Sequence, residues 1–327
     1  MKVLYIGGTG EISHACVEEA NRAGHQVSVF NRGQSARLLP AVVENIVGDI
    51  TDNSAYSRLA ERGFDVICQF MAFDTGRVQG DINLFSGHCG QYIFISSAAA
   101  YQKPCQSHVI NEDTPLDNPY WQYARSKASC ENLLLTAHAE GILPATIVRP
   151  SHTYSTRLPS TVVDGDHLAW RLLRDKPVVV HGDGESLWTL THSADFARAF
   201  VPLCGLSESL GECVHITSSE GYTWNVILRA VSELLAKEPA ICPVSSRTLV
   251  SYQEGWEGPL LGDKSNSVLF DNSKIKRLVD GWHCRVTLAE GLQRVWTHAR
   301  KRIEAGYRPN PKLDALVDRI IKEQTAN

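Results

Sequence analysis

Short apolar runs alternate with longer amphipathic segments through the first half of the chain. Such runs are typical of strands buried on both faces of a parallel sheet, and we predict strands at residues 2–6, 26–30, 42–47, 66–70, 92–96 and 145–148. Between the first two, a helix over residues 13–23 is expected to stop at Gly24. This alternation predicts an α/β fold with a Rossmann-type, doubly wound parallel sheet.

The pattern changes after Arg149 and Pro150. Loops rich in Ser, Thr, Pro and Gly are expected as far as Gly184, followed by a helix over 194–203, a strand over 213–216 and a short strand at 268–270. We therefore expect two interleaved domains. The sheet domain comprises residues 1–150 plus about 190–218, and a smaller C-terminal domain comprises about 151–189 plus 219–327.

Composition excludes several classes of partner. The 327 residues are 43% hydrophobic and carry a net charge of −4, which does not favour nucleic acid or an anionic membrane. No apolar run approaches the ~18 residues of a membrane span, and the N-terminus enters the first strand directly. The nine cysteines form no CxxC pair and no zinc-like spacing, so we expect no metal, reduced thiols and a cytoplasmic setting.

A glycine-rich turn links the first predicted strand to the first helix. This strand, turn and helix order is the context of a dinucleotide fingerprint, in which the pyrophosphate lies against the helix N-terminus. Ser13 replaces the third glycine of the fingerprint and is small enough to keep helix and strand close. The residues expected to contact the cofactor here are Gly7, Thr9, Gly10, Glu11 and Ile12.

The end of the second strand bears on the choice between NAD and NADP. An acidic residue here would hold a ribose 2′-hydroxyl, whereas the chain has Asn31 and Arg32. Arg32 either binds a 2′-phosphate or stacks on adenine while Asn31 bonds the ribose, and we favour NADP over NAD. After the third strand, Asp49 and Ile50 are candidates for the adenine edge, with a plain turn role for Asp49 as the alternative. Arg37 is expected to be a solvent-facing charge.

Ser97, Tyr123 and Lys127 suggest hydride-transfer chemistry. A tyrosine with a pKa near ~10 is a poor base at neutral pH. A lysine four residues later lies beside it on a helix and favours the phenolate. The Ser97 hydroxyl can then hold the substrate oxygen whose proton Tyr123 takes, with Ser96 and Tyr120 as fallback candidates.

Taken together, these motifs resemble the extended short-chain dehydrogenase/reductase family of NAD(P)-dependent sugar epimerases and dehydratases. The resemblance implies that Ser97 and Tyr123 act on the substrate hydroxyl or ketone, and that Lys127 binds the nicotinamide ribose. It also implies a possible homodimer. It is carried across the chain by the glycine turn, 48–50, 94–101, 123–127 with Glu131, 147–150, 181–184, 191–195 and 270–274.

The chain departs from the family pattern at two places. Ala98 and Ala99 replace the Asp-Glu pair of the dehydratases, which removes the acid and base for eliminating water. No arginine follows the 181–184 segment to grip a phosphate, although Lys264 lies near the place expected for a second such arginine. Other substrate candidates are His152 and Tyr154, with loop packing as the alternative, and Trp188, with core packing as the alternative.

The leading hypothesis is an epimerase that oxidises a sugar or sugar-nucleotide hydroxyl to a ketone and reduces it again. The second is a dehydrogenase or ketoreductase acting on a sugar- or nucleoside-like substrate with the same residues. A third, of another class, is a non-catalytic RNA-binding or regulatory protein on this scaffold, which the basic run at 298–302 favours and the acidic balance opposes.

Overall fold

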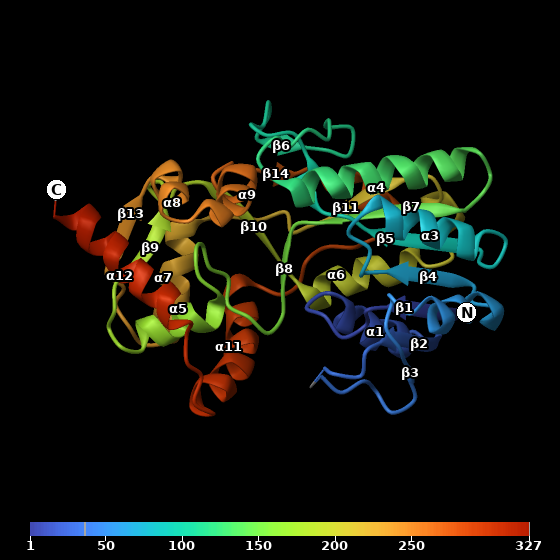
Figure 1. Ribbon diagram of the computed structural model, residues 1–327, viewed down its shortest axis with the longest axis horizontal. Helices are drawn as coiled ribbons and strands as arrows, with labels where there is room; N and C mark the ends of the chain where they lie inside the picture. Colours follow the sequence, from blue (N-terminus) through green and yellow to red (C-terminus); the bar gives the residue numbers. More distant parts are fainter. Residues whose placement is uncertain (36, 327) are drawn as a thin grey trace.

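A seven-stranded parallel sheet is the largest element of the computed structural model, which describes residues 1–35 and 37–326 (Figure 1). The strand order is β11-β7-β5-β4-β1-β2-β3, so the chain runs outward from β1 in both directions. Since all neighbours are parallel, the carboxyl ends of the strands meet at one edge, where doubly wound sheets bind ligands. The strands are β1 (Lys2–Ile6), β2 (Gln26–Asn31), β3 (Glu44–Val47), β4 (Val66–Gln69), β5 (Gln91–Ile95), β7 (Ala145–Pro150) and β11 (Cys213–Ile216).

Helices cover both faces of this sheet, which is why its central strands are mostly apolar. Within β1, Val3 and Tyr5 pack into one cluster with α1 and α6, while Leu4 and Ile6 pack into the cluster beneath α3 and α4. Figure 1 shows the two helical layers on opposite sides of the sheet. Their bounds are α1 (Ser13–Arg22), α2 (Asn53–Ser57), α3 (Thr75–Phe85), α4 (Gln122–Ala139) and α6 (Ser193–Phe200).

The predicted fold class is confirmed, and the predicted strands agree with the observed ones to within one or two residues at their ends. The helix expected over 13–23 ends at Arg22, and the one expected over 194–203 begins at Ser193 and becomes a 3₁₀ turn after Phe200.

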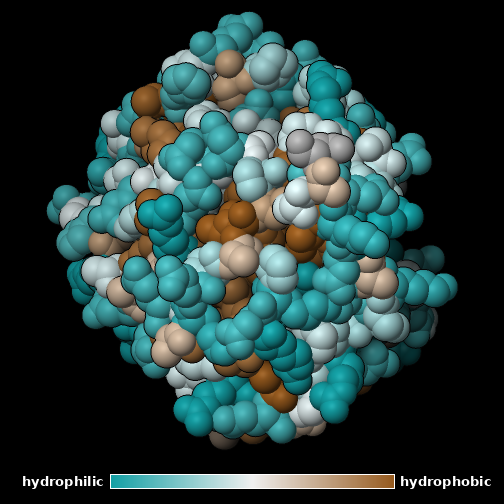
Figure 2. Space-filling model, turned by 90° about the vertical axis from the view of Figure 1, so that its left-hand side faces the viewer, coloured by the Kyte–Doolittle hydropathy of each residue, from teal (hydrophilic) through white to brown (hydrophobic). Residues whose placement is uncertain are grey.

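A second lobe, formed by β9, β13, α5, α7, α8, α9, α11 and α12, lies beside the carboxyl edge of the sheet and contains the C-terminus (Figure 1). Figure 2 views this end of the molecule, whose surface is mostly hydrophilic with apolar side chains gathered near its centre. The bounds are β9 (Val178–His181), β13 (Ile241–Val244), α5 (Gly165–Leu172), α7 (Trp224–Leu234), α8 (Ser246–Tyr252), α9 (Glu257–Pro259), α11 (Leu288–Glu304) and α12 (Pro311–Thr325).

The expectation of loops through Gly184 is wrong for three stretches. Strand β8 (His152–Tyr154), helix α5 and strand β9 all lie there. The Asp164 carboxylate accepts a hydrogen bond from the His167 amide and caps α5, so this aspartate begins a helix where the sequence suggested a loop. Eight residues make little more than two turns, too few for an apolar period to stand out.

Short strands connect the lobe to the sheet. A three-stranded sheet of order β12-β10-β8 contains β8 (His152–Tyr154), β10 (Leu187–His192) and β12 (Gly221–Thr223). A two-stranded sheet pairs β6 (Val109–Ile110) with β14 (Leu269–Phe270), and α10 (Ser273–Leu278) follows it. The interleaved domain limits near residues 150, 190 and 218 remain a prediction. Within the described part of the chain, no helix combines the length and apolarity needed to cross a membrane.

Ion pairs attach the C-terminal helix α12 to the second lobe. Asp314 of α12 contacts Arg171 and His167 of α5, together with Lys176, while Asp318 contacts the same Arg171 and Lys176. The Arg171 side chain is only 1% exposed, so its charge depends on these partners. Burial opposes ionisation of Asp314, but the hydrogen bonds and positive charges around it lower its pKa to about 2.

We predict that Asp314→Ala destabilises the protein by about 2 kcal/mol, because it leaves the buried Arg171 with Asp318 alone. Urea unfolding at neutral pH measures the effect. Asp318→Ala is the matched control, and since Asp318 is 47% exposed it is expected to cost less than about 1 kcal/mol. The stabilisation from Asp314 should be complete above about pH 4 and should disappear as pH falls toward 2. Equal losses in the two variants would contradict this assignment.

Candidate active site

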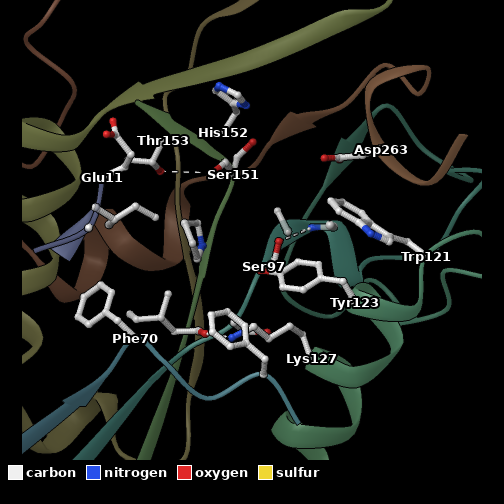
Figure 3. Close-up of a pocket in the computed structure, with 18 of the residues that line it drawn as sticks. Glu11, Phe70, Ser97, Trp121, Tyr123, Lys127, Ser151, His152, Thr153 and Asp263 are labelled. Carbon is white, nitrogen blue, oxygen red and sulfur yellow. Dashed lines mark hydrogen bonds between the residues drawn. The ribbon is translucent and has the colours of Figure 1, made fainter. Parts of the chain in front are cut away.

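A cavity of about 490 Å³ lies at the carboxyl edge of the sheet, between the strand ends and the second lobe (Figure 3). Its walls come from the glycine turn after β1, the loops after β4 and β5, the start of α4, strand β8 and the segment before β14. The predicted catalytic residues Ser97, Tyr123 and Lys127 all line it. Residues as far apart in the sequence as Gly10 and Phe270 therefore meet around one space.

The glycine turn between β1 and α1 fits a dinucleotide phosphate. Gly7 has a φ of 88°, which favours glycine, and a Cβ on Gly8 would lie 2.8 Å from both methyl groups of Val29. Among the described residues, the amides of Glu11 and Ile12 have no hydrogen-bond acceptor and lie at the start of α1. Free amides at a helix N-terminus bind anions such as pyrophosphate.

Ser13, at the place of the third fingerprint glycine, braces this turn. Its hydroxyl donates to the Gly7 carbonyl oxygen at 2.6 Å and accepts from the Gly10 amide at 2.9 Å. The serine therefore holds the turn closed with two hydrogen bonds, although the fingerprint has a glycine at this position.

Glu11 has a role that its sequence position did not indicate. Its carboxylate accepts hydrogen bonds from the amides and hydroxyls of Ser155 and Thr156, which follow β8. Arg37, expected to face solvent, instead donates to the Gly10 carbonyl at 2.5 Å and to the Ser155 hydroxyl at 2.9 Å. Both side chains tie the glycine turn to the segment that leads into the second lobe.

The adenosine end of the groove contains Asn31, Arg32 and Asp49. Asn31 accepts from the Gly33 amide at 2.6 Å and donates to Asn45, which fixes the turn after β2. Asp49 accepts from the amide and hydroxyl of Thr51, and these bonds lower its pKa, so it has the turn role named as the alternative. Arg32 is exposed beside this turn. Ile50 packs partly against the core cluster under α3.

Ser97 and Tyr123 are positioned by different elements. Ser97 ends the loop after β5, where its hydroxyl accepts from the Ala99 amide at 3.1 Å and caps a 3₁₀ turn over Ala98–Ala100 (Figure 3). Tyr123 lies in the first turn of α4, 5.0 Å between ring centroids from Trp121. Burial raises the pKa of Tyr123, a hydrogen bond from Ser97 lowers it, and the negative charge of Asp263 raises it. The phenol is therefore neutral at neutral pH in the ligand-free protein.

Lys127 lies one turn later on α4 and is only 2% exposed. Its Nζ donates to the carbonyl oxygens of Ala72 and Ile95, both at 2.7 Å, and lies 5.9 Å from the centroid of the Tyr123 ring. Burial lowers the pKa of Lys127 to about 8. Two of its three hydrogens are used by the backbone, which leaves one for a ligand hydroxyl such as that of a ribose.

The four substrate candidates lie in different places. His152 lines the cavity, and burial together with Lys264 lowers its pKa to about 3, so the imidazole is neutral. Tyr154 and Trp188 are 3% and 2% exposed in the core of the second lobe and do not line the cavity. Lys264 does not line it either, although its backbone oxygen accepts from His181 and Ser186. Of the fallbacks, Ser96 lines the cavity and Tyr120 does not.

Several cavity residues were missed from the sequence. Four of them carry no motif and lie in four separate segments: Phe73, Lys103, Trp121 and Asp263. An aromatic residue two positions before the tyrosine was the one available signal, since Trp121 necessarily lies near Tyr123. Among the described residues, no group of three or more His, Cys, Asp or Glu side chains could hold a metal ion.

The comparisons with known proteins agree with this geometry. Residues 82–209 match the model of the NAD dependent epimerase/dehydratase family. This segment contains Ser97, Tyr123 and Lys127 and is similar to that family. The match agrees with the resemblance of the motifs in indicating an NAD-dependent enzyme of the extended short-chain dehydrogenase/reductase type.

Individual relatives cover most of the chain at low identity. The 2′-dehydrokanamycin reductase of Streptomyces kanamyceticus is 28% identical over 87% of this chain and 81% of that protein. The chloroplast stem-loop binding protein of 41 kDa b of Arabidopsis thaliana is 26% identical over 71% of this chain and 62% of that protein. The structure of dTDP-glucose 4,6-dehydratase from Bacillus anthracis with NAD has a TM-score of 0.75 and 20% identity, covering 93% of this chain and 98% of that one.

Proposed function

We propose that this protein is an NAD(P)-dependent epimerase that inverts a hydroxyl-bearing carbon of a sugar or sugar nucleotide. The observation that carries the proposal is the placement of Ser97, Tyr123 and Lys127 around one cavity that begins at the glycine turn. When bound along that turn, the cofactor would accept and return a hydride.

The side chains of the chain itself would handle the proton. Ser97 would orient the substrate oxygen beside the phenol of Tyr123, and Tyr123 would take the hydroxyl proton during oxidation and give it back during reduction. Lys127 would hold the ribose with its third hydrogen, and its positive charge would favour the phenolate. The neutral imidazole of His152 would add a hydrogen-bonding group without a charge.

A second candidate is a ketoreductase that exchanges its cofactor freely. Two observations favour it: the ligand-free Tyr123 is a neutral phenol ready to donate a proton to a ketone, and the relative that covers 87% of this chain is a reductase. A third candidate, an RNA-binding protein, gains support from the stem-loop binding relative. The net charge of −4 and the complete set of Ser97, Tyr123 and Lys127 oppose it. The cytoplasmic setting and a homodimer remain predictions.

Product mass and cofactor retention test the choice. We expect purified protein to carry oxidised cofactor and to convert sugars or sugar nucleotides to products of unchanged mass without added reductant. A ketoreductase would require added NADPH or NADH and yield a product heavier by two hydrogens. We expect no loss of water, because Ala98 and Ala99 supply neither an acid nor a base. A dehydrated product would refute the epimerase proposal, and salt-dependent RNA binding by cofactor-free protein would replace it with the third candidate.

Tyr123→Phe is expected to reduce turnover by about 10²- to 10⁴-fold, because the ring still packs against Trp121 but no proton acceptor remains. Cofactor affinity and melting temperature should stay near those of the unchanged protein. Tyr120→Phe is the matched control, since Tyr120 does not line the cavity and should retain activity. If Tyr123→Phe keeps more than about half of the turnover, Tyr123 is not the proton acceptor.

Arg32→Ala tests our preference for NADP. We expect it to weaken NADP by about 10-fold or more, since a charge-assisted contact to the 2′-phosphate is lost, and to change NAD affinity much less. Fluorescence titration of both reduced cofactors against both proteins measures this. Equal weakening, or a preference of the unchanged protein for NAD, would show that Arg32 stacks on adenine.

A further inference from the structure

Asp263 occupies the end of the cavity opposite the glycine turn. It belongs to a π-helical turn (Leu260–Lys264) just before β14, and it lines the cavity with Trp121 and Ser97. Figure 3 shows its carboxylate turned toward the open centre, across from Glu11 and Phe70. A substrate held at Tyr123 would extend past Trp121 to this carboxylate.

Two positive charges, Lys103 and Lys264, act on this carboxylate from a distance, and neither pairs with it. Among the described residues, the Asp263 carboxylate has neither a hydrogen bond nor an ion pair. Lys103 also lines the cavity, but its Nζ donates to the Cys105 sulfur at 3.4 Å and forms no ion pair with Asp263. Burial raises the pKa of Asp263 to about 6, even though Lys103 and Lys264 act in the opposite direction. An unpaired carboxylate at such a position is costly to the fold.

The turn that carries Asp263 is held in place. Asn118 is buried and donates from one amide group to the carbonyl oxygens of Gly262 and Ala99, both at 2.7 Å. Helix α9, just before this turn, packs on Trp121 so closely that a Cβ on Gly258 would lie 2.8 Å from the indole nitrogen, and a Cβ on Gly262 within the turn would lie 3.1 Å from the Cβ of Trp121. These contacts fix the backbone of Asp263 relative to the loop of Ser97, so its side chain stays at the cavity.

Away from the glycine turn, the cavity does not suit a second diphosphate. In the part of the chain that the structure describes, its lining contains no arginine, and its two cations are Lys103 and Lys127. The Lys127 ammonium already donates two hydrogen bonds to backbone carbonyl oxygens. A nucleoside diphosphate carries at least two negative charges and is normally held by forked guanidinium groups. With the carboxylates of Glu11 and Asp263 included, the lining has no excess positive charge to match it.

We infer that Asp263 binds the ammonium group of an amine-bearing saccharide that carries no nucleotide, with Trp121 against the sugar ring. This inference rests on the proposed function, whose substrate it narrows from sugars and sugar nucleotides to amino sugars. The ammonium would give this half-buried carboxylate the ion pair and the hydrogen bonds that the protein does not supply. The apolar face of a sugar ring would cover the indole.

Calorimetric titration of the protein saturated with its cofactor tests the inference. The probes are the disaccharide of glucosamine, its N-acetylated form, cellobiose and UDP-glucose, near neutral pH. We expect the amine-bearing disaccharide to bind about 10-fold or more tightly than its N-acetylated form or cellobiose, because only it forms the ion pair. UDP-glucose should bind more weakly than the amine-bearing disaccharide.

Asp263→Asn should reduce that preference to within about 2-fold, whereas the matched control Asp280→Asn, an exposed residue of the loop after α10, should preserve it. Asp263→Asn should also have the same or a higher melting temperature, since it removes a half-buried charge that has no ion-pair partner. Replacement of a merely structural aspartate would lower the melting temperature. An undetectable affinity for the amine-bearing disaccharide, tighter binding of UDP-glucose, or an unchanged preference in Asp263→Asn would overturn the inference. Tyr123→Phe should keep the preference for the amine-bearing disaccharide. If the unchanged protein binds this disaccharide through Asp263 but transfers no hydride, the result contradicts the proposed function and leaves the inference about Asp263 standing.

Discussion

A buried ion pair between Arg149 and Glu131 fixes the catalytic helix to the sheet. Arg149 lies next to the last residue of β7 and Glu131 lies on α4, and their side chains are 4% and 0% exposed. Nη2 of Arg149 lies 2.6 Å from Oε2 of Glu131, and a second bond from Nε makes the contact bidentate. The free energy needed to remove two charges from water offsets much of their mutual attraction. Such a pair therefore fixes the relative position of helix and strand more than it stabilises the fold.

The same guanidinium sets the relation between α4 and the loop of Ser97. Nη1 of Arg149 donates to the Tyr101 hydroxyl and to the Glu112 carbonyl oxygen, and Tyr101 follows the 3₁₀ turn that Ser97 caps. One side chain thus orients the helix that carries Tyr123 and Lys127 and the loop that carries Ser97. The Tyr101 hydroxyl also meets Nδ1 of His215 on β11, which extends the network to the edge of the sheet. The relative positions of Ser97, Tyr123 and Lys127 depend on this buried network, although none of the network residues lines the cavity.

The elements and residues that could be predicted from the sequence are those that follow a local pattern. Strands such as β1 and β11 were found at their true limits because a strand buried on both faces is apolar at every position. Ser97, Tyr123 and Lys127 were recognisable since their spacing is set by one helix and one strand end. Helix α5 was missed because Asp164 caps too short a segment. Trp188 could not be placed, since nothing local distinguishes a tryptophan that packs on Trp224 from one that stacks on a sugar.

Asp263 and Lys103 were beyond sequence reasoning for a different reason. They are 160 positions apart, and tertiary contacts such as the hydrogen bond from Asn118 to Gly262 and the packing on Trp121 bring their segments to one cavity.

The two carboxylates Glu11 and Asp263 show how tertiary contacts decide the state of a side chain. Both carboxylates line the cavity and both are partly desolvated. Burial would raise the pKa of Glu11, but the hydrogen bonds from Thr156 and Ser155 and the charge of Arg37 outweigh it, so its pKa is lowered. At Asp263 no hydrogen bond opposes burial, and its pKa rises. The first carboxylate is already satisfied as a structural link between the glycine turn and the segment after β8. The oxygens of the second carboxylate accept no hydrogen bond from the described residues. A ligand that donates to them therefore gains more binding free energy there than at the satisfied Glu11.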